Sequence, residues 1–337
     1  MRPPLVLLAS LSAACVTNTV SPKDDDTTSM RDCDVSVVTT SPTEGATDVS
    51  YRSPVVFTLS APDDSAVVIS DYAGTLAVSE DGLTLTWTSD APLPPDTDIT
   101  VTLSTCAGDE VVHLHTSTLG MPVEDGLLID GAFAIDLVHA RIRAPEGLGD
   151  VIVQLWKEDV LVGVRGIGGG TLDLVGAVGT DDADPVQQNY CNPTIDLTGD
   201  YRAAPYFSVG PVDTTLPFDR GEATIEGMYL TGTFTAEGRS FQDGTFGGTV
   251  DTRPLSWILN ASDDPGAICT LAAALGVACE PCAADGAPYC LTLVAEDVTG
   301  TRIATGPIVV IDTADCRGCR NWTAATVPAI EERVCPP

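Results

Sequence analysis

The sequence predicts an all-β protein of two domains, a β-sandwich followed by a disulfide-rich antiparallel β-barrel or sandwich with one short helix. Three observations lead to this prediction. Short segments that alternate apolar and polar residues recur along the chain, with turn residues between them about every ten positions. Glycines recur on the apolar side of the later segments, which is typical of a tightly curved sheet. The chain has 337 residues, enough for two domains, and 11 of them are cysteines.

The first fifteen residues have the layout of an export signal. Arg2 precedes an apolar run at positions 5–8, and small residues then lead to Cys15. The run is too short to span a bilayer as a permanent helix. Residues 11–15 (LSAAC) resemble the lipobox of bacterial lipoproteins, although that family prefers leucine three places before the cysteine and Leu11 lies four before it. The alternative is an ordinary secretory signal that is cut near Ala14.

The lipobox resemblance implies that Cys15 carries a diacylglyceryl group and becomes the mature N-terminus. Val16 follows it, not the aspartate that in this family often signals retention in the inner membrane. The resemblance therefore implies a lipid anchor in the outer membrane of a Gram-negative host. Residues 1–15 are expected to be the signal peptide with its lipidation cysteine. Residues 16–32 are polar and charged without an apolar period, so we expect a flexible acidic tether there.

The chain is strongly acidic. Its net charge of −32 comes from 48 acidic residues against 16 basic ones. Such a surface repels phosphate backbones and anionic lipid headgroups, so nucleic acid is excluded as a partner and electrostatic membrane binding is disfavoured. Calcium, high salt and solubility remain as uses of the charge, and solubility is the interpretation that we favour.

The cysteines favour disulfide bonds. Once Cys15 is set aside an even number remains, which in an exported chain indicates a disulfide framework. These cysteines are Cys33, Cys106, Cys191, Cys269, Cys279, Cys282, Cys290, Cys316, Cys319 and Cys335. The pairs at 279/282 and 316/319 resemble the two knuckles of a four-cysteine zinc site. Export and the crowd of neighbouring cysteines favour disulfides over zinc, so no metal is expected.

Residues 33–119 are predicted to form the sandwich. Alternating segments run through positions 35–39, 55–60, 83–88 and 99–104. Residues 41–49 (SPTEGATDV) with 54–60 (PVVFTLS) resemble the opening of the bacterial Ig-like domains of surface-layer and envelope proteins, and residues 93–101 (LPPDTDITV) are similar to a late strand of that family. The resemblance implies spacing, adhesion or assembly and brings no catalytic residues. From their positions alone, Cys33 and Cys106 are expected to join the ends of this domain.

Residues 120–126 are the predicted linker, and residues 127–337 the second domain, of unknown function. Its predicted strands include residues 127–129, 133–138, 151–156, 160–164 and 172–178. The clearest segment covers residues 224–235. Its expected inward set is Met228, Leu230, Gly232 and Phe234, and its expected solvent-facing set is Tyr229, Thr231, Thr233 and Thr235. The recurring Gly-Thr-Phe at 232 and 244, with turn residues between, predicts an antiparallel meander.

One helix is predicted at residues 264–275. Asp264 can cap it, Pro265 suits the first helical position, and Gly276 ends it. One face is apolar and is expected to pack on the meander; it consists of Ile268, Leu271, Ala272 and Leu275. Disulfides of Cys269, within the helix, and Cys279, just beyond it, are expected to fix it there.

Several residues are of types found in metal, catalytic or phosphate sites, but a structural role is favoured for each. His113 and His115 alternate on one predicted strand face, where a solvated face is favoured over a metal patch. His139 is the sole histidine of the second domain, and no Gly-x-Ser-x-Gly motif supplies a nucleophile for it. The glycine-rich residues 166–170 lack the lysine and the following helix of a phosphate loop, which favours a hairpin turn. The acidic stretches 24–26 and 181–184 lack EF-hand spacing, so solvated loops are favoured over calcium sites.

The sequence therefore predicts a lipid-anchored envelope protein, non-enzymatic and without cofactor, in which an Ig-like spacer presents a β-rich binding or structural domain. Its partners would be the membrane, through the anchor, and an unidentified protein or glycan. One alternative is an extracellular hydrolase, in which Asp200 or Asp219 would converge with Asp251 or Glu226 in the second domain. A calcium-dependent adhesin is the other alternative.

Overall fold

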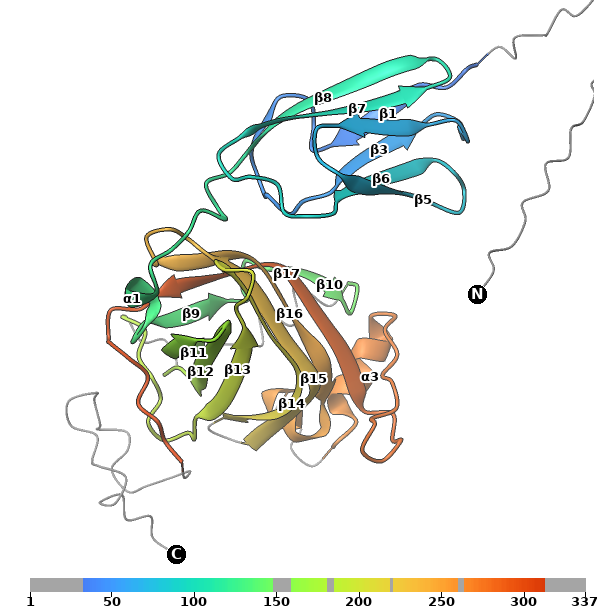
Figure 1. Cartoon of the computed structure of the whole chain (residues 1–337). Coiled ribbons are helices and arrows are strands. Elements are labelled where there is room, and N and C mark those ends of the chain that lie inside the picture. Colours follow the sequence, from blue (N-terminus) through green and yellow to red (C-terminus); the bar gives the residue numbers. More distant parts are fainter. Residues whose placement is uncertain (1–32, 148–158, 181–184, 219–220, 260–263, 313–337) are drawn as a thin grey trace, which may run out of the picture.

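The computed structural model describes residues 33–147, 159–180, 185–218, 221–259 and 264–312. Within them the chain forms two β domains in succession (Figure 1). Several predictions fall outside these ranges: the signal peptide with Cys15, the tether, the strand at 151–156 and the acidic loop at 181–184. Three of the cysteines, Cys316, Cys319 and Cys335, and the carboxylate of Asp219 do so as well.

The first domain is a sandwich of two four-stranded sheets, as the alternating segments predicted. One sheet has the order β1-β3-β6-β5, with β1 Val37–Ser41, β3 Val55–Leu59, β6 Thr84–Ser89 and β5 Gly74–Val78. The other has the order β2-β8-β7-β4, with β2 Ala46–Val49, β8 Gly108–Thr116, β7 Asp98–Thr105 and β4 Val67–Ser70. All pairings are antiparallel except β2 with β8, which is parallel. Phe57, Trp87 and Val101 are among the side chains of the two sheets that meet in its core.

The structure contains the Cys33–Cys106 disulfide expected from the positions of the two residues, with 5.9 Å between the Cα atoms. Cys106 follows β7, and its backbone N–H donates to a carboxylate oxygen of Asp63 at 2.8 Å. The bond therefore joins the start of the domain to a late strand across 73 positions of sequence.

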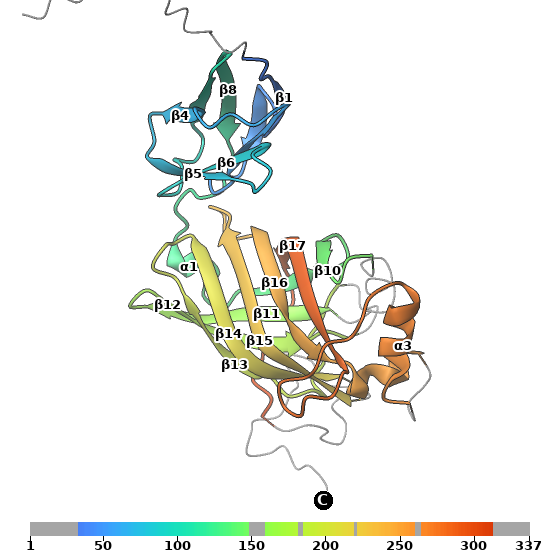
Figure 2. The same cartoon turned by 90° about the vertical axis from the view of Figure 1, so that its right-hand side faces the viewer.

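The second domain is a closed antiparallel barrel, which decides between the barrel and the sandwich that the sequence left open. Eight strands follow one another around the ring, most of them labelled in Figure 2, and the last pairs with the first. In order they are β9 Ala132–Asp136, β11 Val160–Gly168, β12 Thr171–Val178, β13 Ile195–Asp200, β14 Tyr206–Phe218, β15 Gly221–Phe234, β16 Ser240–Asp251 and β17 Cys290–Arg302. A ninth strand, β10 Arg141–Ala144, pairs with the same edge of β17 as β9 does, earlier along β17.

One end of the barrel is filled by aromatic rings. Phe207 stacks on Phe234 with 4.8 Å between ring centroids, and Phe133, Phe241 and Tyr201 pack around them. We call these five residues the aromatic plug. The plug requires glycine on the neighbouring strands, because a Cβ at Gly300 would lie 2.0 Å from the Phe241 ring.

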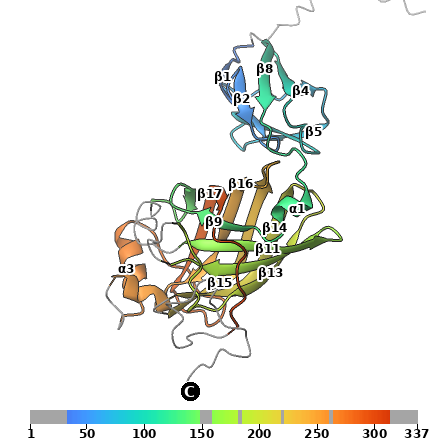
Figure 3. The same ribbon diagram turned by 90° about the vertical axis from the view of Figure 1, so that its left-hand side faces the viewer.

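The outer face of β9, β11 and β12 is covered by the segment that follows β17 (Figure 3). Ile308 packs there on Leu161 and Val175. The amide of Gln188 holds this segment in place, because its nitrogen donates to the carbonyl of Val309 at 2.7 Å and its oxygen accepts from the N–H of the same residue at 2.8 Å. The barrel wall is therefore apolar on both faces along these strands, which explains the continuous apolar runs in their sequences.

The two domains meet at Tyr51 and Arg52. The Tyr51 hydroxyl lies 3.4 Å from Oγ1 of Thr233, and the Arg52 guanidinium carbon lies 3.9 Å from the centroid of the Tyr206 ring. This contact corrects one prediction. Thr233 was expected to face water with Tyr229, Thr231 and Thr235, but it is 1 % exposed because Tyr51 covers it.

Two short helices differ from expectation. Residues 127–129, predicted as a strand, belong in part to helix α1 Asp125–Leu128, which places Leu128 in the barrel core. The Arg302 guanidinium donates to the carbonyl of Leu127 and so satisfies a helix end.

The predicted later helix is α3 Ala267–Ala274, which is shorter than the predicted residues 264–275. Asp264 turns the chain before the helix, because its carboxylate accepts from the N–H of Gly266 at 2.9 Å.

The apolar face of α3 is only partly buried, which is less than predicted. Ile268 packs against the barrel core and Ala272 is buried, whereas Leu275 is 47 % exposed. Cys269, near the start of the helix, and Cys279, just beyond its end, are disulfide-bonded as expected, but they bond to each other, with 5.6 Å between the Cα atoms, and so tie the helix to the segment that follows it. The covalent bond therefore compensates for a small packing interface.

The two disulfides lead to a stability prediction. Replacing both Cys33 and Cys106 by serine should lower the free energy of unfolding by roughly 4 kcal/mol, because the released loop is long. Replacing Cys269 and Cys279 releases a loop of 10 positions and should cost roughly 3 kcal/mol. Denaturant unfolding followed by circular dichroism compares the two variants. A smaller loss for the first pair than for the second would contradict the role given to the Cys33–Cys106 bond.

Candidate binding pocket in the barrel

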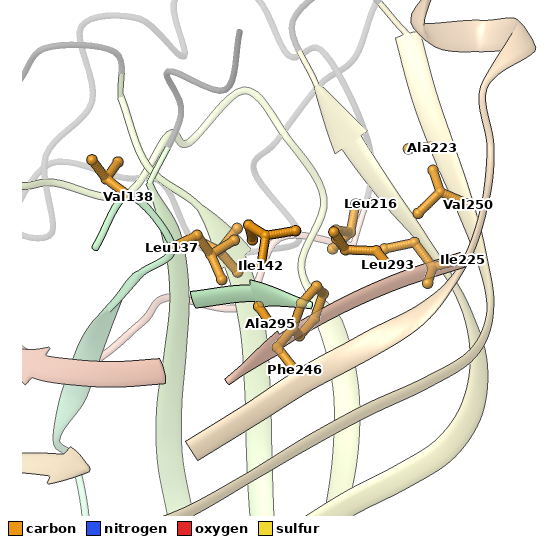
Figure 4. Close-up of a pocket in the computed structure, with 11 residues that line it drawn as sticks. Leu137, Val138, Ile142, Leu216, Ala223, Ile225, Phe246, Val250, Leu293 and Ala295 are labelled. Carbon is orange, nitrogen blue, oxygen red and sulfur yellow. The ribbon is translucent and has the colours of Figure 1, made fainter. Parts of the chain in front are cut away.

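The half of the barrel away from the aromatic plug contains an apolar cavity of about 40 Å³ (Figure 4). We call it the outer cavity. Its lining consists of Leu137, Val138, Ile142, Val160, Leu216, Ala223, Ile225, Phe246, Val250, Leu293 and Ala295. All of these side chains are apolar, and no polar surface is exposed to the cavity. The site can therefore accept hydrocarbon but offers no side-chain hydrogen bond to a polar ligand group.

Strand register brings the lining together. Leu216 pairs with Ala223 at the end of β14 and the start of β15, and Ile225 pairs with Val250 on β16. Phe246 in turn pairs with Ala295 on β17. These strands carry the aromatic plug at their other ends, since Phe207 is the second residue of β14 and Phe234 ends β15. The same alternation thus fills one end of the barrel with rings and leaves the other end lined by smaller side chains.

The connection between β9 and β10 supplies the mouth of the outer cavity. Leu137 and Val138 come from this connection, and Ile142 comes from β10 itself. Val138 is 53 % exposed, so the lining reaches the surface there. The mouth is consequently apolar up to the point where it meets water.

A second apolar cavity, which we call the inner cavity, adjoins the first and also measures about 40 Å³. Val160, Leu216 and Phe246 line both cavities. Met228 and Leu230 line the inner cavity alone, and Thr214 contributes its one polar side chain. The barrel interior beyond the aromatic plug thus contains two small apolar spaces with a shared boundary.

Charged side chains close to the mouth are paired on the outside of the barrel. Arg141 and Arg143 alternate with the inward-facing Ile142, and each donates to Oε2 of Glu296 at 2.8 Å. The hydrogen bond from Arg143 is the main cause that lowers the pKa of Glu296 below its ordinary value. The arginines and carboxylates therefore neutralise one another beside the mouth, in a chain that is otherwise strongly acidic.

The histidines considered as metal ligands are each paired with carboxylates. His113 Nδ1 lies 2.9 Å from Glu44, and His115 lies 2.7 Å from Asp98 and 3.2 Å from Asp96. In the ranges that the structure describes, no cluster of three or more histidine, cysteine, aspartate or glutamate side chains has the arrangement of a metal site. His139 is also exposed and pairs with Asp136 at 2.7 Å.

The carboxylates proposed for a hydrolase do not converge. Asp200 ends β13 beside Ser208, at the plug end of the barrel, where Arg202 pairs with it and lowers its pKa to about 2. Asp251 ends β16 at the opposite end and pairs with Arg253 at 2.6 Å. Glu226 lies on β15, where it accepts from the backbone N–H of Ala283 at 3.3 Å. Asp200 therefore lies at the other end of the barrel from Asp251 and Glu226 and converges with neither.

Two further motifs have structural roles. Cys279 bonds to Cys269 and Cys282 bonds to Cys290, so neither sulfur is a free thiolate for zinc in this structure. Cys191 is disulfide-bonded as well.

The glycine-rich residues 166–170 form the hairpin between β11 and β12, with positive φ at Gly169 and Gly170.

Sequence reasoning did not find the outer cavity. Its lining comes from the connection before β10 and from β10, β11, β14, β15, β16 and β17, and its residues are ordinary core types that carry no chemical signature. The size of the inward residues along the strands is a sequence signal for the cavity. Phenylalanine dominates at one end of β14 to β16, whereas Ala223, Ile225 and Val250 occupy the other.

The comparisons with known proteins identify no family. No family model matches the chain, and no curated protein matches it significantly. Among solved structures, L,D-transpeptidase 3 from Mycobacterium tuberculosis shares 26% identity over 24% of this chain and 37% of its own, with a TM-score of 0.20. This chain thus matches little more than a third of that enzyme's length.

Two other solved structures are similarly distant. An L,D-transpeptidase from Mycobacterium smegmatis shares 16% identity over 42% of this chain and 75% of its own, with a TM-score of 0.21. Domains 1–6 of surface layer protein SbsC share 9% identity over 84% of this chain and 55% of that one, with a TM-score of 0.18. With TM-scores this low, these similarities carry no argument about the fold or the function of this chain. Within the described residues, no helix has the length and apolarity needed to cross a membrane.

The pairing of His115 leads to a pH prediction. Its hydrogen bonds to Asp98, first, and Asp96 raise its pKa above the ordinary 6.5. The stability that this pairing provides is therefore complete below pH 6.5 and is lost as the pH rises through the higher folded-state pKa. Asp98→Asn should lower the pKa of His115 in an NMR titration, and Glu80→Gln, a change at an exposed glutamate in the turn between β5 and β6, should not. An unchanged pKa in Asp98→Asn would contradict the assignment.

Proposed function

We propose that this chain is an exported, non-enzymatic protein of the cell envelope, anchored by a lipid on Cys15, whose barrel domain binds a small apolar ligand. The observation that carries the binding function is the outer cavity, a wholly apolar space that reaches the surface at Val138. The sandwich acts as a spacer between the anchor and the barrel.

Barrel size and energetics support the binding function. An eight-stranded barrel is just wide enough for its interior to be filled by side chains or to hold one small ligand, and barrel mouths are common ligand sites. A cavity of about 40 Å³ costs roughly 1 kcal/mol if it stays unfilled. A bound apolar group would recover that free energy and add its own transfer from water.

The distribution of charge supports a binding rather than a hydrolytic role. Asp200 and Asp251 lie at opposite ends of the barrel, each in an ion pair. The carboxylate beside the mouth, Glu296, is bound by two arginines and faces away from the cavity. General acid–base catalysis on a bound ligand needs a titratable group within hydrogen-bond reach, and the cavity lining provides none.

The anchor and the outer-membrane location are supported by the lipobox-like residues 11–15 and by Val16. The Cys33–Cys106 bond and the other disulfides suit an oxidising compartment outside the cytosol. The contact of Arg52 with Tyr206 places the spacer at the plug end of the barrel, so the outer cavity lies at the end away from the spacer. A ligand could then approach without passing the first domain.

Filling the outer cavity tests the binding function. Leu293→Trp places a larger side chain in the cavity and should weaken binding of an unbranched primary alcohol, used as the apolar probe and measured by isothermal titration calorimetry, at least tenfold. Leu291→Trp, two positions away on the same face of β17 but outside the cavity lining, is the matched control and should bind as the parent does. Thermal unfolding verifies that both variants are folded. Equal probe binding by the parent and Leu293→Trp would rule out this cavity as the site.

Removing the lipidation cysteine tests the anchor. Cys15→Ala should shift the protein from the detergent phase to the aqueous phase or leave it as uncleaved precursor, because it has no thiol to carry diacylglycerol. Mass spectrometry of the parent N-terminus should show a lipidated Cys15. A mature chain that begins elsewhere and carries no lipid would contradict the anchor without affecting the binding function.

A further inference from the structure

We infer that the outer cavity accepts one unbranched alkyl chain, and that Phe246, at the boundary with the inner cavity, sets the length of chain that fits. This inference rests on the proposed binding function and specifies its ligand class and its specificity-determining residue. The chain would enter beside Val138 with its free end leading, and its polar end would stay in water at the mouth.

The positions of the lining residues along β15 place the two cavities in series. Ala223 and Ile225, at the start of the strand, line the outer cavity. Met228 and Leu230, farther along, line the inner cavity, and Phe234, at the end, belongs to the aromatic plug. Going inward along this strand, a ligand meets the outer cavity, then the inner cavity, and finally the plug.

The boundary between the cavities is formed by three side chains from three strands. Val160 comes from β11, Leu216 from β14 and Phe246 from β16, and each lines both cavities. Phe246 has the largest side chain of the three, and Figure 4 shows its ring standing between Ala295 and Ile225 within the outer cavity. The ring is 7 % exposed and packs in the core. A chain that fills the outer cavity therefore ends against this ring unless the ring moves.

The size and polarity of the cavities select an alkyl chain over a ring or a polar ligand. Each cavity measures about 40 Å³, whereas an apolar cavity that holds benzene measures about 150 Å³. A narrow chain with one methylene per step can occupy such a space. A polar group carried inside would meet only the Thr214 hydroxyl, so burying it would be unfavourable.

The charged side chains beside the mouth restrict which polar group the ligand can carry at its outer end. Arg141 and Arg143 are already bound by Glu296, and Arg141 also contacts Asp297 at 3.2 Å. The group has no surplus positive charge, and the chain as a whole carries −32. An uncharged polar end, such as a hydroxyl, is therefore compatible with the mouth, and an anionic one is disfavoured.

A chain-length series tests this inference on the full-length protein. Unbranched primary alcohols of increasing length are titrated directly by isothermal titration calorimetry. In the parent, affinity should rise about fourfold per methylene and then level off when the chain end reaches Phe246. In Phe246→Ala, which joins the cavities, the levelling-off should move to longer chains. If Phe246→Ala does not fold, two other variants take its place. They are Phe246→Leu and Leu216→Ala, which opens the same boundary.

The control removes a ring of the plug. Phe241→Ala also creates space, but behind the inner cavity, and should leave the length profile unchanged.

Alcohols branched near their free end should bind the parent at least tenfold more weakly than unbranched ones of equal carbon number. If the parent binds no alcohol of any length, both this inference and the proposed binding function fail. If it binds them but the boundary variants leave the levelling-off unchanged, the inference fails and the binding function stands.

Discussion

Closure of the second domain depends on strand β17, which pairs on both of its edges. Residues 240–251 of β16 pair with one edge along nearly its whole length, and the other edge pairs first with β10 and then with β9. Phe133 on β9 thereby lies opposite Arg302, at the far end of the domain's sequence. Without this contact, β9 and β17 would both present open edges, and the inward apolar faces would reach water. The cavities, the aromatic plug and the covering segment after β17 all depend on that closure.

The two ends of the barrel differ because of where glycine occurs. At the plug end, Gly232 and Gly300 leave room for the rings of Phe207 and Phe241, since a Cβ on either glycine would lie within 3.0 Å of a ring. The strands can then approach closely and the interior fills. At the other end the inward positions are Ala223, Ile225 and Val250, which are too small to meet across the barrel. Unfilled apolar space is therefore a consequence of side-chain size in a ring of fixed circumference.

Much of the fold follows from local patterns. Alternation predicted the strands of the sandwich and the inward set on β15, and the positions of Cys33 and Cys106 predicted their bond. The pairing of β9 with β17 could not be derived, because it joins residues more than a hundred and fifty positions apart that have no special composition. The burial of Thr233 was missed for a related reason, since the residue that covers it, Tyr51, belongs to the other domain. The binding pocket was missed because its lining consists of ordinary core residues gathered by closure.

The proposed function depends on the binding of an unbranched alkyl chain inside the barrel. The most direct measurement is an isotope-filtered NMR experiment on the full chain with a ¹³C-labelled unbranched alcohol, which detects protein hydrogens close to the ligand. We expect contacts from the ligand to the methyl groups of Ile225, Leu293 and Val160, which line the outer cavity. Contacts confined to exposed apolar residues of the first domain, such as Val67 and Ile69, or no contacts at all, would contradict this proposal.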